Sequence, residues 1–206
     1  MSGFTLPSVL NNDYSIDGDV TISADDGNGV IVANGGRFGG FSLWVDHGKP
    51  VFSYNLVMMD MNRWKGADKL TPGKHTLRFS FTYDGGGLGK GGLGTLSDDG
   101  RTLDSHRIPR TICCTQVWFE GLDVGADNSM PVDDRYTVPN KFTGGIDQVV
   151  FHTGEMKLTT EQENEYASAR QRWVGSEARE LPGSCAEVCL RRVGRLRVLA
   201  TLSTLR

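Results

Sequence analysis

The chain has 206 residues, 38% of them hydrophobic and 23% charged, with a formal net charge of −3, which suits one globular domain with an ordinary core. No apolar run approaches the ~18 residues that a membrane-spanning helix needs, and residues 1–7 lack the basic and apolar segments of a secretion signal. Membrane insertion is therefore not expected, and the compartment stays open. Residues 181–206 carry five arginines and one acid, so the acidic excess lies in the body, which argues against a nucleic-acid-binding face there.

Alternation of apolar and polar side chains with a period of two predicts strands along most of the chain. The longest covers residues 75–83 and places Leu77, Phe79 and Phe81 on one face. Other strands are expected at residues 14–23, 30–33, 41–46, 51–55, 94–96, 101–103, 107–112, 117–124 and 143–152. One helix is expected after Thr159 or Thr160, which can cap it, and before Gly175.

Short strands joined by glycine-rich turns favour an all-β antiparallel β-sandwich of the jelly-roll kind with one C-terminal helix. The expected boundaries are a sandwich over residues 1–154, the helix within 155–180, and a basic tail, disordered or weakly structured, over 181–206.

Residues 84–94 form the most unusual stretch, because seven of the eleven are glycine. Glycine reaches positive φ at little cost and lets a ligand or another backbone come close. Gly89-Lys90 is similar to the end of a phosphate-binding G-x-x-x-x-G-K-[ST] loop, but Asp84 stands at the first glycine position and Gly91 follows the lysine. We therefore expect a turn after the strand 75–83, with close approach to a neighbouring domain or a ligand as the role of Gly85, Gly86, Gly87, Gly89, Lys90, Gly91 and Gly92.

The four cysteines and four histidines lack the spacing of a disulfide framework or a zinc site. Cys113 and Cys114 are adjacent, and the histidines are scattered singly. Cys113 is expected in or near the core, with a reactive thiol as the open alternative.

An acidic loop over residues 123–134 offers oxygen ligands of the kind that calcium prefers, from Asp123, Asp127, Asp133 and Asp134. The spacing matches no EF-hand, since the required glycine and terminal glutamate are absent. Calcium is the candidate cofactor here, and a solvated loop held by side-chain turns is the alternative.

Three methionines lie close together, at Met58, Met59 and Met61. Methionine fills gaps in cores and also forms adaptable binding surfaces. Core packing is the favoured interpretation, and a binding surface is the alternative.

Several runs, taken together and in order, resemble the C-terminal domain of large bacterial arylsulfatases. They are residues 35–43, 49–55, 72–79, 84–94, 119–125 and 141–144, and the resemblance extends from about Pro7 to Phe151. It implies a concanavalin-like or laminin-G-like sandwich that follows a sulfatase catalytic domain. It implies no catalytic residue in this chain, because the C/S-x-P-x-R motif of that family is absent.

The expected function is that of a non-catalytic accessory domain, with a sulfatase catalytic domain or a glycan as its partner. A stand-alone carbohydrate-binding module is one alternative, in which Trp44, Tyr54, Trp64 or Trp118 stacks on a sugar ring and Arg37 or Arg63 pairs with an anion. A glycan hydrolase of sandwich fold is another, but Glu120 and Asp123 would point to opposite faces of a strand.

Overall fold

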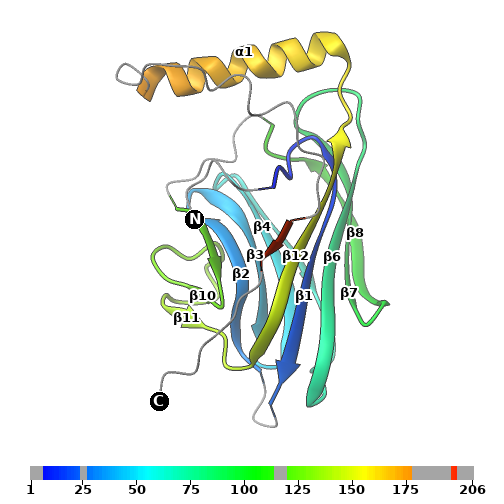
Figure 1. Cartoon of the computed structure of the whole chain (residues 1–206), viewed down its shortest axis with the longest axis vertical. Helices are drawn as coiled ribbons and strands as arrows, with labels where there is room; N and C mark the ends of the chain where they lie inside the picture. Colours follow the sequence, from blue (N-terminus) through cyan, green and yellow to red (C-terminus); the bar gives the residue numbers. More distant parts are fainter. Residues whose placement is uncertain (1–6, 24–26, 114–119, 178–195, 199–206) are drawn as a thin grey trace.

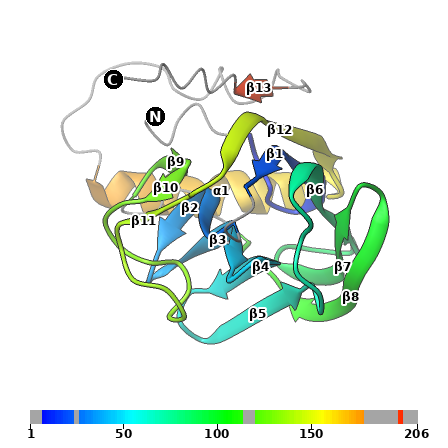
Figure 2. The ribbon, with the colours of Figure 1, turned by 90° about the horizontal axis from the view of Figure 1, so that it is seen from below.

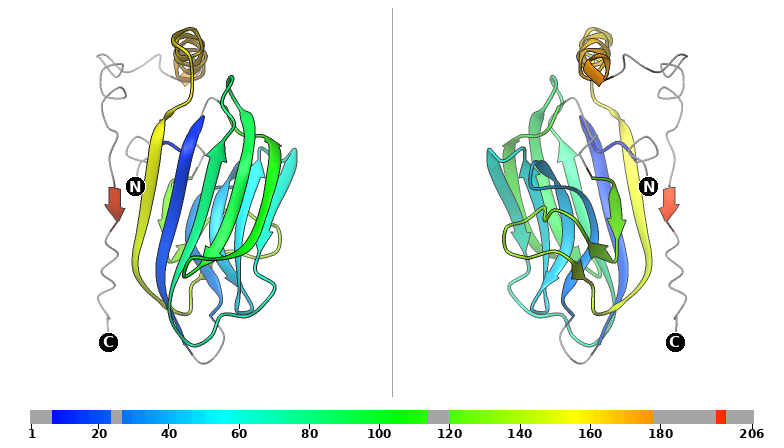
Figure 3. Two further views of the ribbon diagram at one scale, coloured as in Figure 1. Left: turned by 90° about the vertical axis from the view of Figure 1, so that its right-hand side faces the viewer. Right: turned by 90° about the vertical axis from the view of Figure 1, so that its left-hand side faces the viewer.

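The computed structural model of the chain describes residues 7–23, 27–113, 120–177 and 196–198. Two β-sheets pack face to face as a sandwich, and one helix lies across one end of it (Figure 1, Figure 3). Neighbouring strands pair antiparallel, apart from a parallel pairing of β2 with β11. The architecture expected from the sequence, an all-β sandwich with a helix near its C-terminus, is confirmed.

Sheet A has the strand order β13, β12, β1, β6, β7, β8, and sheet B has the order β10, β11, β2, β3, β4, β5, with β9 paired to β2. The strands of sheet A are β1 (Asn12–Ile22), β6 (Gly73–Tyr83), β7 (Lys90–Asp98), β8 (Arg101–Arg110), β12 (Gly145–Met156) and β13 (Leu196–Val198). Those of sheet B are β2 (Gly29–Gly36), β3 (Gly39–Asp46), β4 (Lys49–Leu56), β5 (Asp60–Lys65), β9 (Leu122–Val124), β10 (Ala126–Asp127) and β11 (Asn140–Lys141).

The main core lies between the two sheets. Leu77, Phe79 and Phe81 of β6 are buried there, as their alternation predicts. Phe79 stacks on Phe52 of the opposite sheet with a distance of 3.5 Å between ring centroids and 6° between the planes. Burying such aromatic side chains from both sheets is the main force that holds the layers together.

A second apolar cluster lies on the outer face of sheet B, which is why β2, β3 and β4 are buried on both faces. Trp44 packs edge-on against Tyr136, with ring centroids 5.0 Å apart, and Val132 joins them. Val132 belongs to the acidic loop, and Tyr136 follows it within the segment between β10 and β11, which runs along the outside of the sheet (Figure 2). The loop is therefore a cover for apolar surface as well as a polar segment.

The helix α1 (Thr160–Glu177) begins with a reciprocal cap. Thr159 Oγ1 accepts a hydrogen bond from the Gln162 amide, and Gln162 Oε1 accepts one from the Thr159 amide. The helix continues past Gly175, so the expected stop at that glycine is wrong. No helix among the described residues is long and apolar enough to cross a membrane.

Three further expectations are corrected. Cys113 is disulfide-bonded, so neither the absence of disulfides nor a free thiol at this position holds. In the glycine-rich stretch, β7 begins at Lys90, so Gly91, Gly92 and Gly94 belong to a strand and only residues 84–89 form the turn. The expected short strands at 101–103 and 107–112 are one strand, β8.

Candidate functional site

A pocket of about 290 Å³ opens beside the turn between β4 and β5. Its walls come from three segments that are distant in sequence: the β2–β3 turn, the β4–β5 hairpin and the acidic loop. We call it the Met58 pocket, and its lining includes Arg37, Asn55, Met58, Asp60, Met61 and Asp134.

The buried amide of Asn55 joins these three segments. Its Nδ2 donates to the carbonyls of Gly36 and Arg37 in the β2–β3 turn, at 3.2 and 2.9 Å, and to the carbonyl of Val132 in the acidic loop, at 3.2 Å. Its Oδ1 accepts a hydrogen bond of 3.0 Å from the Met58 amide. One side chain, 3% exposed, thus fixes the walls of the pocket relative to one another.

The β4–β5 turn is strained and apolar. The Met59 amide donates to the Leu56 carbonyl, and the two central residues, Val57 and Met58, have φ values of 43° and 64°. Glycine and asparagine normally occupy such positions, and a β-branched residue there is a genuine outlier. Strain of this kind concentrates at functional sites. The side chains point outward, with Met58 64% and Met59 68% exposed, which corrects the favoured interpretation of these methionines as core residues.

Arg37 supplies an exposed positive charge at the pocket. No hydrogen bond or ion pair joins its guanidinium to another side chain in the part of the chain that the structure describes. Phe38, next to it, is 48% exposed, and Val57 across the pocket region is 38% exposed. The site therefore combines a cation that is open to a ligand with exposed apolar side chains.

Arg63, by contrast, forms hydrogen bonds with two aspartates of the acidic loop. Its Nε and Nη2 donate to the two oxygens of Asp133 at 2.7 and 2.9 Å, and Nη2 also bonds Asp134. Ser53 donates to Asp133 as well, and Trp44 Nε1 donates to Ser53. Burial raises the pKa of Asp133, but the hydrogen bonds from Arg63 and Ser53 outweigh it and hold the pKa below its usual range.

The expected sugar-stacking surface is corrected at three of its four aromatic positions, and the fourth, Trp118, lies outside the described residues. Trp44 is 2%, Tyr54 6% and Trp64 0% exposed. The Tyr54 hydroxyl accepts a hydrogen bond from the Ile112 amide, and Trp64 Nε1 donates one to the Gly94 carbonyl. Because their faces are covered by protein, these rings are core residues, and Arg37 is the member of the expected ligand-binding set that stands open at the pocket.

The four aspartates of the expected calcium site do not converge. Asp133 and Asp134 bond Arg63, Asp127 accepts from Tyr136 and Val132, and Asp123 accepts from Asn128. Burial raises the pKa of Asp127, which is 1% exposed. Among the described residues, the group of side chains with metal-binding geometry lies elsewhere, at His75, Asp98 and Asp99. The loop is therefore held by protein donors, as the alternative interpretation supposed.

The glycine turn 84–89 is organised around a hydroxyl of the protein itself. Tyr83 donates its hydroxyl hydrogen to the Gly87 carbonyl at 2.5 Å and accepts from the Lys90 amide at 2.9 Å. The Gly89 amide donates to Asn11 Oδ1. Gly91 and Gly92 approach backbone of their own sandwich, since a Cβ would lie 2.0 Å from the Ile108 carbonyl oxygen and 2.3 Å from that of Thr82. These two close approaches are therefore to backbone of the same domain, and the expected approach of the glycine-rich stretch to a neighbouring domain or a ligand stays a prediction.

Sequence reasoning missed Asn55, Asp60 and Met61 as parts of one site. The methionine cluster was the available signal, and its alternative interpretation, an adaptable surface, fits the exposure of Met58 and Met59. Nothing in the local sequence marks Asn55, because the carbonyl groups that its Nδ2 contacts lie 18 to 77 residues away.

No protein-family model matches this chain, and no curated protein matches it. Among solved structures it is similar to domains LG4-5 of the mouse laminin α1 chain, with 13% sequence identity, a TM-score of 0.54 and coverage of 71% of this chain and 37% of that one. It is also similar to the LG1-3 region of the laminin α2 chain, with 15% identity, a TM-score of 0.49 and coverage of 71% of this chain and 29% of that one. A third similar structure is the binding domain of botulinum neurotoxin serotype D, with 13% identity, a TM-score of 0.46 and coverage of 77% of this chain and 37% of that one.

The chain thus spans about a third of the length of these structures. At such identities the likeness defines the fold, which is a laminin-G-like, concanavalin-like β-sandwich. The comparisons show no relation to arylsulfatases.

Proposed function

We propose that this chain is a non-catalytic binding module that docks onto another protein domain through the Met58 pocket and the exposed turn 57–59. The observation that carries the proposal is the turn itself. Val57 and Met58 hold left-handed backbone while their side chains stand exposed beside the pocket. Each such residue costs on the order of 1–3 kcal/mol, which a turn of Asn-Gly type would avoid.

A protein surface suits this site better than a sugar. Unbranched methionine side chains adapt to apolar partners, and exposed apolar residues beside polar ones are typical of interaction surfaces. Trp44 and Trp64, two of the rings expected to stack on a sugar, are buried. Arg37 adds a charge that would pair with a carboxylate of the partner and fix orientation.

The arylsulfatase resemblance suggests a particular partner, a sulfatase catalytic domain. In that case the module contributes packing or substrate recognition, and the chemistry belongs to the partner. The absence of the C/S-x-P-x-R motif supports a non-catalytic role.

Binding of the full chain to a bacterial arylsulfatase catalytic domain lacking its own C-terminal domain tests the proposal by titration calorimetry. We expect saturable binding that Met58→Asp weakens at least tenfold. Leu93→Ser is the matched control, because Leu93 is 37% exposed on β7, away from the pocket, and should leave affinity unchanged. Equal weakening by both variants, or no binding by the unaltered chain, would contradict the docking role.

A sulfated glycan is the second candidate, favoured by the open guanidinium of Arg37 next to the pocket. An array of sulfated and unsulfated oligosaccharides separates the two: sulfate-dependent binding that Arg37→Ala abolishes and Arg110→Ala preserves would identify a lectin-like module. If no oligosaccharide on the array binds the chain, the lectin-like function is excluded and protein docking remains as the proposal.

A further inference from the structure

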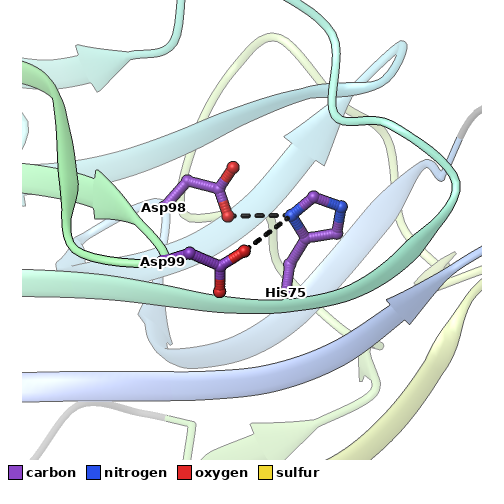
Figure 4. Close-up of side chains that lie close together, drawn as sticks. All are labelled: His75, Asp98 and Asp99. Carbon is purple, nitrogen blue, oxygen red and sulfur yellow. Dashed lines mark hydrogen bonds and ion pairs between the residues drawn. The ribbon is translucent and has the colours of Figure 1, made fainter.

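A second cluster of functional groups lies at the opposite end of the sandwich from the Met58 pocket. His75 stands near the start of β6, and Asp98 and Asp99 stand at the turn between β7 and β8 (Figure 4). One nitrogen or oxygen from each of the three side chains lies within 4.8 Å of the other two. These residues are 23 and 24 positions apart, so only the pairing of β6 with β7 brings them together.

The orientation of the His75 ring is fixed from its far side. Nε2 lies 2.8 Å from the carbonyl oxygen of Thr71, an acceptor, so Nε2 must carry a hydrogen. The ring is 92% buried and cannot turn freely. Nδ1 is therefore the nitrogen that faces both carboxylates (Figure 4). An imidazole that donates one N–H to a backbone carbonyl while its other nitrogen meets carboxylates has the usual environment of a metal-binding histidine.

The distances also suit an ion. Nδ1 lies 2.9 Å from Asp98 Oδ1 and 3.6 Å from Asp99 Oδ2. Ligand atoms around an ion bound at about 2.0–2.2 Å are separated by roughly 3.0–3.5 Å. The observed separations bracket that range, so small side-chain movements would bring the three atoms onto one ion.

The geometry points to a divalent cation site formed by His75 Nδ1, Asp98 and Asp99, with zinc as the ion that the donor set fits best. An imidazole nitrogen favours zinc and its neighbours in the transition series, whereas calcium prefers oxygen ligands alone. Asp98 is 12% and Asp99 58% exposed, so the ion would be reached from the solvent side and would keep a position open for water or for a group from a partner.

A comparison within the chain shows what is special about His75. Each of the four histidines lies near an aspartate: His47 near Asp46, His106 near Asp104, and His152 near Asp17. Among the described residues, only His75 has two carboxylates at its free nitrogen. The other pairs lack the third ligand that a specific site requires.

Without a metal, a proton takes the place of the ion. Burial lowers the pKa of His75, but the Thr71 carbonyl and the two aspartates outweigh burial and raise it, so the imidazolium satisfies the same carboxylates. Binding of an ion at Nδ1 would displace that proton.

Asp99→Asn provides a clean test. Asp99 has φ of 48° and precedes Gly100 in the turn, and its Oδ1 accepts a hydrogen bond of 2.9 Å from the Thr76 amide. Asparagine tolerates this backbone equally well and keeps an acceptor oxygen. The variant should thus fold normally and lose only an anionic ligand. Asp104→Asn is the matched control, since it removes the carboxylate of a histidine pair that has no third ligand.

The chain is first stripped with a chelator and then titrated with ZnCl₂ and, separately, CaCl₂, while calorimetry and thermal unfolding are followed. We expect one zinc per chain, a rise of the melting temperature, and affinity at least tenfold weaker in Asp99→Asn but unchanged in Asp104→Asn. In parallel, imidazole NMR should show a zinc-dependent shift of His75 Nδ1 while Nε2 stays protonated. Equal zinc affinity of Asp99→Asn and the unaltered chain, calcium binding as tight as zinc binding, or an unmoved Nδ1 resonance would overturn the assignment.

Discussion

The indole ring of Trp64 lies directly against the backbone of Gly94, and its Nε1 donates a hydrogen bond of 2.9 Å to the Gly94 carbonyl. The two residues come from opposite sheets, β5 and β7. A Cβ at position 94 would lie 2.4 Å from the Cζ2 atom of the indole. Glycine is therefore required at this point of the strand so that a buried tryptophan can pack between the layers.

Gly94→Ala should lower the free energy of unfolding by about 1–3 kcal/mol, because the indole must shift within a close-packed core. Urea denaturation measures the effect. Gly145→Ala is the control, since its Cβ would meet Thr21 at 3.5 Å, an ordinary contact, and a change within about 0.5 kcal/mol is expected. Similar losses in both variants would show that strand glycines matter here for another reason.

The double variant Val57→Asn, Met58→Gly should be more stable than the unaltered chain by about 1 kcal/mol or more, because both residues suit positive φ. It should also lose docking, since the exposed apolar side chains are gone. Melting temperature and calorimetric binding are read on the same sample. A variant that is destabilised, or that keeps full affinity, would remove the strain argument from the proposed function.

Acid should weaken the contact between Arg63 and Asp133. The pKa of Asp133 is lowered in the folded state, so the stability it contributes is present above the pKa of the unfolded carboxyl, about 3.9, and is lost as pH falls through the folded value. In Asp133→Asn this part of the acid dependence should vanish, and the variant should be less stable at neutral pH by about 3 kcal/mol, because Arg63 loses its buried partner. Asp134→Asn, with its side chain 86% exposed, should keep the acid dependence.

Asn34 offers a route to greater stability. It is 1% exposed, and neither its Nδ2 nor its Oδ1 has a hydrogen-bond partner in the described part of the structure. Asn34→Leu should raise the free energy of unfolding by about 1 kcal/mol, because an unpaired buried amide is replaced by an apolar group of similar size. Asn55→Leu, the same exchange where the amide is fully bonded, should lower it by about 1–3 kcal/mol. Effects of equal sign would contradict this contrast.

The periodicity of β6 predicts its buried face, because alternate residues of a strand lie on the same face of the sheet. Leu77, Phe79 and Phe81 follow this pattern. The sandwich follows from repeating that rule. The alternation pattern fails in β7, because its glycines have no side chain that could show which residues are apolar. The predicted strand therefore begins at Gly94, four residues after the true start of β7 at Lys90.

The candidate sites depend on contacts that no local pattern encodes. Met58 was expected in the core because methionine usually is, but the hairpin turn places it outside. Asn55 reaches Val132 across 77 residues, and His75 meets Asp98 only because two strands pair in a particular register. The sequence shows which potential ligand atoms are present, but the register of strand pairing determines which of them lie close together.

Six of the seven glycines of residues 84–94 obey two unrelated constraints. Gly85, Gly86 and Gly89 have φ between 62° and 75°, a question of chirality, and a D-amino acid would satisfy it as well as glycine does. At Gly91, Gly92 and Gly94 a Cβ would collide with neighbouring atoms, so there the constraint is the available volume. What looks like one low-complexity run is therefore two adjoining pieces of backbone, one selective for handedness and the other for size.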